Sequence, residues 1–343
     1  MSKKKLISVV ESQAADPPPT WLMRQAGRYL PEYRALRASA GSFWKMCMDA
    51  TLAAEITLQP LRRFGFDAAI IFSDILTVPY ALGCAVSFTE GEGPSLPPVE
   101  SATGLERDPA VWQTKLLPAY ETLDRVRGAL GAETALLGFA GAPWTLATYM
   151  AAGRGGDEQR AAKQWAARAP QDFQALLDLL ADCVAQHLIA QIDAGADAVQ
   201  IFDSWASGLC DAEFVSWVVQ PTARVVHMVR AQKPAARIIG FPRGMQPARA
   251  EHFLLETGVD AISVDTHTSM TEMLAATGGR TALQGNLDPL LLVEGGEAMR
   301  QAVRRLLDEM RGRRFIFNLG HGILPQTPIA HVEELLKLVR GEA

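Results

Sequence analysis

Two arginines near the N-terminal end of the chain are the first residues whose type and spacing suggest a chemistry. Arg24 and Arg28 lie four residues apart, in a segment that also contains Gly27 and Pro31. A helix would place both guanidinium groups on one face, but the glycine and the proline make a loop at least as good an expectation. Because a guanidinium group pairs with a carboxylate through two parallel hydrogen bonds, this pair fits a clamp for a molecule with several carboxylates. A solvated arginine loop is the alternative interpretation.

Asp74 is the second candidate, because its carboxylate emerges from very apolar sequence. Apolar residues precede it at 70–72 and follow it at 75–76. An unpaired charge in such surroundings is costly. Asp74 therefore needs an arginine, a set of N–H donors or a cationic ligand, although an ion pair that only holds a loop would also satisfy it.

One histidine differs from the others in its position. His321 lies between two glycines directly after the apolar run 315–318, which predicts a place in the lining of a crevice. His267 follows Asp265 and Thr266 without a His-x-Cys or His-x-x-x-His partner, so a zinc site is not expected. The histidines that fall in helical patterns are expected to be packing or surface residues: His187, His227, His252 and His331.

The elements that must position these residues repeat along the chain. A Gly-x-Asp-Ala sequence ends a helical pattern three times, each time before a short apolar run, starting at Gly65, Gly195 and Gly258. Seven short apolar runs predict parallel strands buried on both faces: 68–72, 135–139, 199–202, 237–241, 262–264, 281–285 and 315–318. Helix-length amphipathic segments lie between most of them: 112–130, 173–194, 212–229, 298–310 and 328–339.

The even alternation of strands and helices favours an α/β fold with a single (β/α)8 TIM-type barrel over an open, doubly wound sheet. No eighth strand is evident from the pattern. We expect one domain over residues 1–343, with an N-terminal clamp segment at about 20–40, and a loop or hairpin tip rather than a linker at 90–98. No Gly-x-Gly-x-x-Gly or Gly-x-x-x-x-Gly-Lys-Ser/Thr motif indicates a nucleotide site.

In such a barrel the active site lies at the carboxyl ends of the strands. That rule selects the residues just past each apolar run: 73–74, 140–144, 203–204, 242–244, 265–267, 285–286 and 320–322.

Composition limits the class of protein. A formal net charge of -5 argues against nucleic acid or an anionic membrane as a partner. The four cysteines lie far apart without a CxxC pair, and no signal peptide is visible, so we expect a soluble, cytoplasmic protein. Glycines and a proline interrupt the apolar stretch 135–153, which predicts a strand, a loop and a helix start rather than a membrane span.

Six segments, in order, carry a resemblance to a known family: 23–34, 57–63, 71–76, 141–146, 284–289 and 318–322. Over nearly its whole length the chain resembles the uroporphyrinogen decarboxylases of tetrapyrrole and heme biosynthesis. The resemblance implies a homodimer without metal or cofactor. It also implies a cyclic tetrapyrrole substrate with four acetates and four propionates, uroporphyrinogen III, whose acetates become methyls to give coproporphyrinogen III. The substrate-binding residues that it implies are Arg24, Gln25, Ala26, Gly27, Arg28, Asp74, Tyr149, Ser204 and His321.

The resemblance also implies catalytic roles for Asp74, Arg24 and Arg28. Asp74 would accept hydrogen bonds from the pyrrole N–H groups and stabilise the cation formed when the ring is protonated. Arg24 and Arg28 would orient carboxylates, and one of them, or a water molecule that it holds, is a candidate proton donor, although arginine is a reluctant acid. Tyr149 would position Asp74, while Ser204 and His321 would bind peripheral carboxylates.

Two departures and two alternatives accompany this resemblance. Asp265-Thr266-His267 stands where the family pattern has Asp-Trp-Thr. Gln326-Thr327 follows the segment 322–325 with a spacing of its own. A cobamide-dependent methyltransferase on a related barrel would need thiolate and imidazole zinc ligands near the later strand ends, but no cysteine follows Cys210. A non-catalytic porphyrinogen carrier would keep the clamp without turnover, and the presence of Asp74 with both arginines argues against it.

Overall fold

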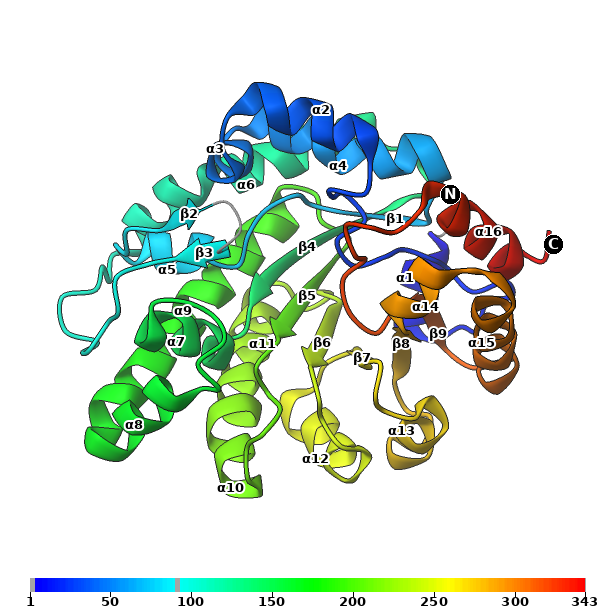
Figure 1. Cartoon of the computed structure of the whole chain (residues 1–343). Coiled ribbons are helices and arrows are strands. Elements are labelled where there is room, and N and C mark those ends of the chain that lie inside the picture. The colour runs from blue at the N-terminus through cyan, green and yellow to red at the C-terminus, as the bar shows by residue number, and fades with distance from the viewer. Residues whose placement is uncertain (1–3, 90–92, 343) are drawn as a thin grey trace.

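Seven parallel strands form the centre of the molecule, which the computed structural model describes over residues 4–89 and 93–342. They pair in the order β1-β4-β5-β6-β7-β8-β9 and curl into a barrel with helices outside (Figure 1). The strands are β1 Ala68–Ile70, β4 Ala135–Gly141, β5 Ala198–Asp203, β6 Ile238–Pro242, β7 Ala261–Ser263, β8 Ala282–Leu287 and β9 Phe315–Leu319. All seven predicted runs are confirmed as strands of the predicted α/β barrel.

The predicted helices are also confirmed, and the observed ones are more numerous. Those in the first half are α1 Lys5–Glu11, α2 Pro31–Ala40, α3 Phe43–Met48, α4 Ala50–Phe64, α5 Thr77–Ala81, α6 Pro109–Ala129, α7 Pro143–Ala152, α8 Arg160–Arg168 and α9 Pro170–Asp193. Those in the second half are α10 Asp211–Phe214, the π-helix η1 Val215–Val219, α11 Gln220–Gln232, α12 Pro247–Thr257, α13 Met270–Ala276, α14 Pro289–Glu294, α15 Gly296–Glu309 and α16 Ile329–Arg340. The helix expected over 212–229 is therefore three elements, with a π-turn in its middle.

The glycines of the repeated unit have the backbone conformation that was predicted. Gly65, Gly195 and Gly258 have φ angles of 62°, 104° and 67°. Side chains with a Cβ rarely adopt positive φ, so glycine permits the sharp turn from each helix into the next strand.

The eighth position of the barrel is taken by a segment too short to count as a strand. Thr20 pairs in parallel with Phe317 of β9, and Phe317 N donates to Pro19 O at 2.9 Å. On its other side, Asp67 N, at the start of β1, donates to Thr20 O at 2.9 Å. The segment therefore bridges the two edge strands and closes the ring of backbone hydrogen bonds.

Helix α1 covers the amino-terminal end of the barrel. Its side chains Leu6, Val9 and Val10 are buried in one cluster with residues that point into the barrel. Lys4 pairs with Asp197 at 2.6 Å, and Arg314 donates to the carbonyl oxygen of Val10 at 2.6 Å. Because this end is filled, the carboxyl ends of the strands are the open face.

The predicted turn at 90–98 lies beside a short antiparallel pair. Strand β2, Ser87–Thr89, pairs with β3, Gly93–Ser95, so a hairpin is confirmed there. The tip, Glu90 to Glu92, lies outside the described residues.

The long apolar stretch forms strand β4 and helix α7, as predicted. Among the described helices α9 alone is long and apolar enough to cross a membrane, by length and composition. Its most apolar window is 67% buried within the fold, and it packs on α6, α7 and α11 (Figure 1). A helix buried in the core of a barrel can be equally long and apolar.

Candidate active site

The arginine-bearing segment is a loop that crosses the open end of the barrel before α2 begins at Pro31. Trp21 Nε1 donates to Gln284 Oε1 of β8 at 2.9 Å inside the barrel. Met23 N donates to Asn318 Oδ1 of β9 at 2.9 Å. These buried hydrogen bonds fix the loop to two strands, and we name residues 21–30 the clamp loop.

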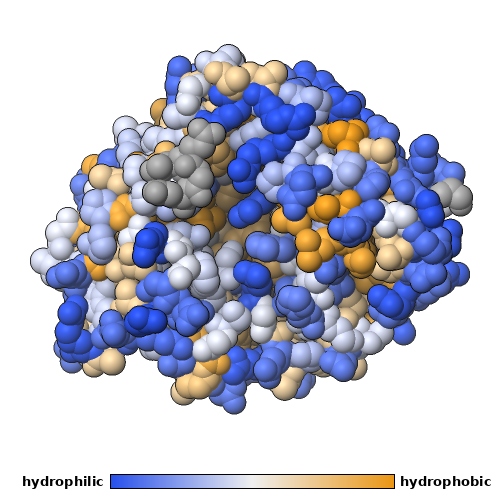
Figure 2. Space-filling view, in the orientation of Figure 1, coloured by the Kyte–Doolittle hydropathy of each residue, from blue (hydrophilic) through white to orange (hydrophobic). Residues whose placement is uncertain are grey.

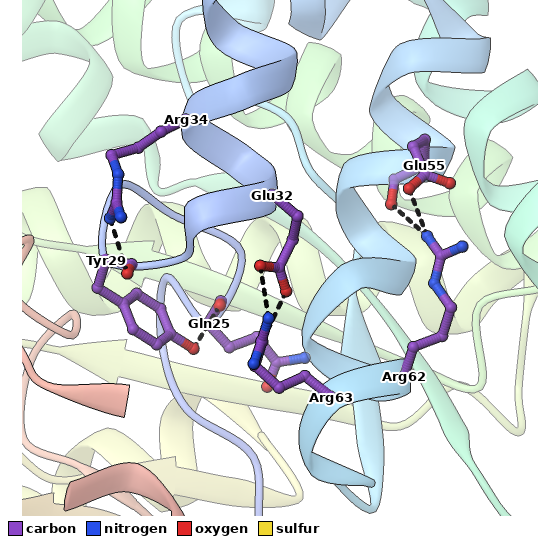
Figure 3. Close-up of polar contacts among 7 residues, drawn as sticks. All are labelled: Gln25, Tyr29, Glu32, Arg34, Glu55, Arg62 and Arg63. Atoms are coloured by element: carbon purple, nitrogen blue, oxygen red, sulfur yellow. Dashed lines mark hydrogen bonds and ion pairs between the residues drawn. The ribbon is translucent and has the colours of Figure 1, made fainter. Parts of the chain in front are cut away.

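The clamp loop is also held by its own side chains. Gln25 is fully buried, where its amide donates to Ala68 O at 3.0 Å and accepts from Leu22 N at 3.1 Å. The hydroxyl of Tyr29 donates to Gln25 O at 2.8 Å (Figure 3). The Gln25 side chain, expected among the substrate-binding residues, is thus occupied in holding the loop.

A second set of contacts joins the start of α2 to its surroundings. Arg34 donates to the carbonyl oxygen of Arg28. It also donates to the carbonyl oxygen of Tyr29, and Arg63 of α4 makes two bonds to Glu32, at 2.8 and 2.9 Å (Figure 3). The bond from Arg63 lowers the pKa of Glu32. Helices α2 and α4 therefore form a firm support behind the clamp loop.

Arg24 and Arg28 are both exposed, and Arg24 lies across the loop that carries His321. A Cβ on Gly322 would lie 2.4 Å from Arg24 Cδ, so any other residue there would displace the Arg24 side chain from its present position. Ile323 N also donates to Met23 O at 2.9 Å. Arg24 has a φ of 60°, a conformation uncommon for any residue except glycine.

Asp74 lies just past β1, half-buried at the open end of the barrel. Its Oδ1 accepts from Leu76 N at 2.9 Å, whereas Oδ2 has no hydrogen-bond partner within residues 4–89 and 93–342. Burial raises the pKa of Asp74, and the Leu76 N–H and the nearby Arg24 lower it. The carboxylate thus keeps one oxygen for a ligand and has a cation near it.

Tyr149, on α7, lies within electrostatic range of both residues. Burial raises the pKa of its phenol, the Asp74 carboxylate raises it further, and Arg24 lowers it. No hydrogen bond joins Tyr149 to Asp74 in the described structure, so the positioning role stays a prediction. The Tyr149 ring meets Trp205 edge to face, with centroids 6.3 Å apart, and half-buried Ser204 directly precedes that tryptophan after β5.

His321 follows β9 and lies between Gly320 and Gly322, which are closely packed against other segments of the chain. A Cβ on Gly320 would lie 2.3 Å from Thr266 N. The pKa of His321 is lowered to about 4, mainly by burial and then by the charges of Arg243 and Arg24, against a smaller opposite effect of Asp265. At neutral pH the imidazole is therefore uncharged and can donate one hydrogen bond and accept another.

The strand-end rule also selected Asp203, but the structure places its side chain on the outer face of β5. Gln200 points into the barrel, where its Oε1 accepts from Gln284 Nε2 at 3.0 Å. Side chains alternate along a strand, so Asp203, three residues on, faces the helices. There its Oδ1 accepts from Thr145 Oγ1 of α7 at 2.5 Å, and its Oδ2 is buried without a partner in the described chain. Burial raises the pKa of Asp203 to about 7.

Replacement Asp203→Asn tests this assignment through stability. The folded-state pKa lies above the ordinary value of 3.8. Because of this group, the free energy of unfolding of the wild type falls by about 1.4 kcal/mol per pH unit as the pH rises toward 7. The asparagine variant lacks that loss. We expect the difference in melting temperature, variant minus wild type, to be a few degrees more positive at pH 8 than at pH 5. An equal difference at both pH values, by thermal denaturation, would contradict the assignment.

Within the described residues, no group of three or more histidine, cysteine, aspartate or glutamate side chains is placed to hold a metal ion. Three cysteines are buried, Cys47, Cys84 and Cys183, and Cys210 is exposed.

Taken together, the structure is a (β/α) barrel whose open end carries two exposed arginines and a carboxylate with one open oxygen, an arrangement that suits an anionic ligand. The family model that matches the chain, over residues 1–341, is described as "Uroporphyrinogen decarboxylase (URO-D)". A protein named uroporphyrinogen decarboxylase from Rhizorhabdus wittichii is 51% identical over 341 residues, covering 98% of both chains. One from Rhodospirillum rubrum is 48% identical over 341 residues, covering 99% of this chain and 98% of its own. The chain belongs to the uroporphyrinogen decarboxylase family.

Solved structures support the fold. A methyltransferase from Methanosarcina mazei superposes with a TM-score of 0.79 at 19% identity, covering 98% of this chain and 97% of its own. A B12-independent methionine synthase from Shewanella has a TM-score of 0.58 at 13% identity, covering 85% of this chain and 86% of its own. At such identities the likeness concerns the barrel alone, and it does not favour the methyltransferase alternative.

Proposed function

We propose that the chain decarboxylates uroporphyrinogen III, converting its four acetate side chains to methyls and giving coproporphyrinogen III in porphyrin and heme biosynthesis. Its relatives at about half identity carry the name of this carboxy-lyase over nearly their full length. The observation that carries the proposal is the open oxygen of Asp74, at the barrel mouth, with Arg24 near it.

The chemistry follows from where charge develops. Loss of carbon dioxide from an acetate on a neutral pyrrole would leave an unstable carbanion, so the ring must first gain a proton and become an electron sink. Asp74 would accept hydrogen bonds from the pyrrole N–H groups and stabilise the protonated ring electrostatically. The carboxylate is already fixed by Leu76 N–H, so little reorganisation is needed when the cation forms.

The surrounding residues would hold the carboxylates of the substrate. Arg24 and Arg28 are exposed on the clamp loop and would orient acetates and propionates through charge-assisted hydrogen bonds. One of them, or a water molecule that it holds, is the proposed proton donor. Neutral His321 and Ser204 would bind peripheral carboxylates, Gln25, Ala26 and Gly27 would contact the substrate between the two arginines, and Tyr149 would help to position Asp74.

The proposal also covers the oligomeric state, the location in the cell and the partners. We expect a single-domain enzyme whose residues at about 20–40 form the clamp, acting as a homodimer in the cytoplasm without metal or cofactor. We expect no nucleic acid and no membrane among its partners, in keeping with its net charge of -5.

Anaerobic incubation of chelator-treated protein with uroporphyrinogen III tests the function. The products are oxidised and separated by chromatography. Decarboxylation predicts porphyrins with seven, six, five and then four carboxylates, appearing in that order. Tight binding without conversion would favour the porphyrinogen carrier instead, and absence of both binding and conversion would refute the proposal.

A further inference from the structure

A cavity of about 460 Å³ lies at the same end of the barrel, lined in part by Trp205, whose ring contacts Tyr149. Eight residues that follow three neighbouring strands line it: Trp205 and Ser207 after β5, Arg243, Gly244 and Gln246 after β6, and Asp265, His267 and Thr268 after β7. None of these side chains has a role in the reaction as described above. The face in Figure 2 is hollowed near its centre, and hydrophilic residues predominate around the hollow. We name the space lined by these eight residues the Arg243 cavity.

Arg243 is the main charged group of this cavity. Its backbone N donates to Asp203 O at 3.0 Å, which fixes the residue to the end of β5. Its side chain is half-buried, and its guanidinium group has no hydrogen-bond or ion-pair partner among the residues that the structure describes. Because Arg243 lowers the pKa of His321, its charge acts on the same space as the active-site mouth.

The carboxylate that lines the cavity is used by the protein itself. Gly244 N donates to Asp265 Oδ2 at 2.6 Å, and His267 N donates to Oδ1 at 2.8 Å. Thr268 Oγ1 adds a bond to Oδ2 at 3.2 Å. With these donors in place, Asp265 shapes the loop instead of pairing with Arg243, and the cavity offers an arginine and a histidine to an anion.

We infer that the Arg243 cavity binds a propionate carboxylate of the tetrapyrrole and so sets the orientation of each successive pyrrole over Asp74. The inference rests on the proposed function. A partly enclosed guanidinium fork without an internal partner fits a carboxylate that arrives with the ligand. The four propionates persist through all four decarboxylations, whereas the acetates disappear. A fixed anion site on the rim can therefore serve every round only if it binds a propionate.

Substitution Arg243→Gln tests the inference, with Arg243→Lys as a charge-retaining variant. The control is Arg305→Gln, which removes an exposed arginine from a neighbouring cavity beside α15 that shares His267 and Thr268 with the Arg243 cavity. The Michaelis constant for uroporphyrinogen III should rise roughly tenfold in Arg243→Gln, as expected for loss of one charge-assisted pair, with little change in kcat. The inhibition constant for coproporphyrinogen III, which keeps all four propionates, should rise by the same factor. Arg243→Lys should fall between this variant and wild type, and Arg305→Gln should match wild type.

Other results would overturn the inference. Unchanged constants in a folded Arg243→Gln protein would show that the cavity holds no part of the substrate. A weaker binding of uroporphyrinogen III together with unchanged binding of coproporphyrinogen III would assign the cavity to an acetate. An equal rise of the Michaelis constant in Arg305→Gln would indicate a general electrostatic effect of positive charge and not a binding site at Arg243. Absence of decarboxylation in the wild type would instead refute the proposed function, so the two failures are distinguishable.

Discussion

The variant Asp74→Asn should fold normally and lose about 10²–10³ in kcat, the scale found when one preorganised electrostatic group is removed from an active site. Asparagine keeps an oxygen that accepts from Leu76 N, so the loop after β1 should stay in place. What is lost is the negative charge that stabilises the protonated pyrrole. The measurement is the initial rate of decarboxylation at saturating substrate, with circular dichroism to confirm the fold.

A control removes a carboxylate that has no part in the site. Asp182→Asn breaks an exposed ion pair with Arg224 between α9 and α11, and it should leave the rate unchanged. Wild-type turnover in a folded Asp74→Asn protein would refute the charge role of Asp74, whatever the fate of the family assignment.

The variant Arg24→Gln should lower kcat/KM by roughly a hundredfold, because a positioned charge-assisted contact to the reacting substrate is lost. A second effect is specific to its place beside Asp74. Arg24 lowers the pKa of Asp74, so its removal should raise that pKa. Activity that needs the ionised carboxylate should then fall at a higher pH as the solution is acidified. The pH profile of kcat/KM measures this shift of the acid limb.

The matched control for Arg24→Gln is Arg62→Gln, which removes an exposed arginine whose partner is Glu55 on the outside of α4 (Figure 3). It should change neither the rate nor the profile. A large loss of rate in Arg24→Gln without any shift of the acid limb would show that Arg24 does not affect the pKa of Asp74, and would contradict their proposed electrostatic coupling.

Much of this architecture was predictable because parallel strands buried on both faces leave short, continuous apolar runs between helices. The strand-end rule then selected Asp74, Ser204 and His321, and the structure places all three at the open end of the barrel. Arg24 and Arg28 were noticed through their spacing alone, and the choice between helix and loop stayed open because the spacing fits a helix whereas Gly27 and Pro31 favour a loop.

Other features could not be read from pattern. The segment that closes the barrel follows three consecutive prolines, Pro17 to Pro19, and pairs through Thr20, so it has neither the length nor the composition of a strand. Strand-end position alone also did not separate Ser204 from Asp203, whose side chain faces the helices. Alternation counted from the barrel-facing Gln200 would have supplied that signal.

The role of Gln25 is a further case. Its neighbours Arg24 and Ala26 lie on the surface or near it, while Gln25 is fully buried and bonds to Ala68 O. A loop has no fixed period, so its sequence does not indicate which side chains turn inward. Only the contact with β1 assigns Gln25 to holding the clamp loop.

The most direct test of the account is a crystal structure of the protein grown anaerobically with coproporphyrinogen III. We predict the macrocycle at the carboxyl end of the barrel, with pyrrole N–H groups about 3 Å from the open oxygen of Asp74. Arg24 should contact a peripheral carboxylate. A macrocycle bound elsewhere, or one whose N–H groups face away from Asp74, would contradict the central claim.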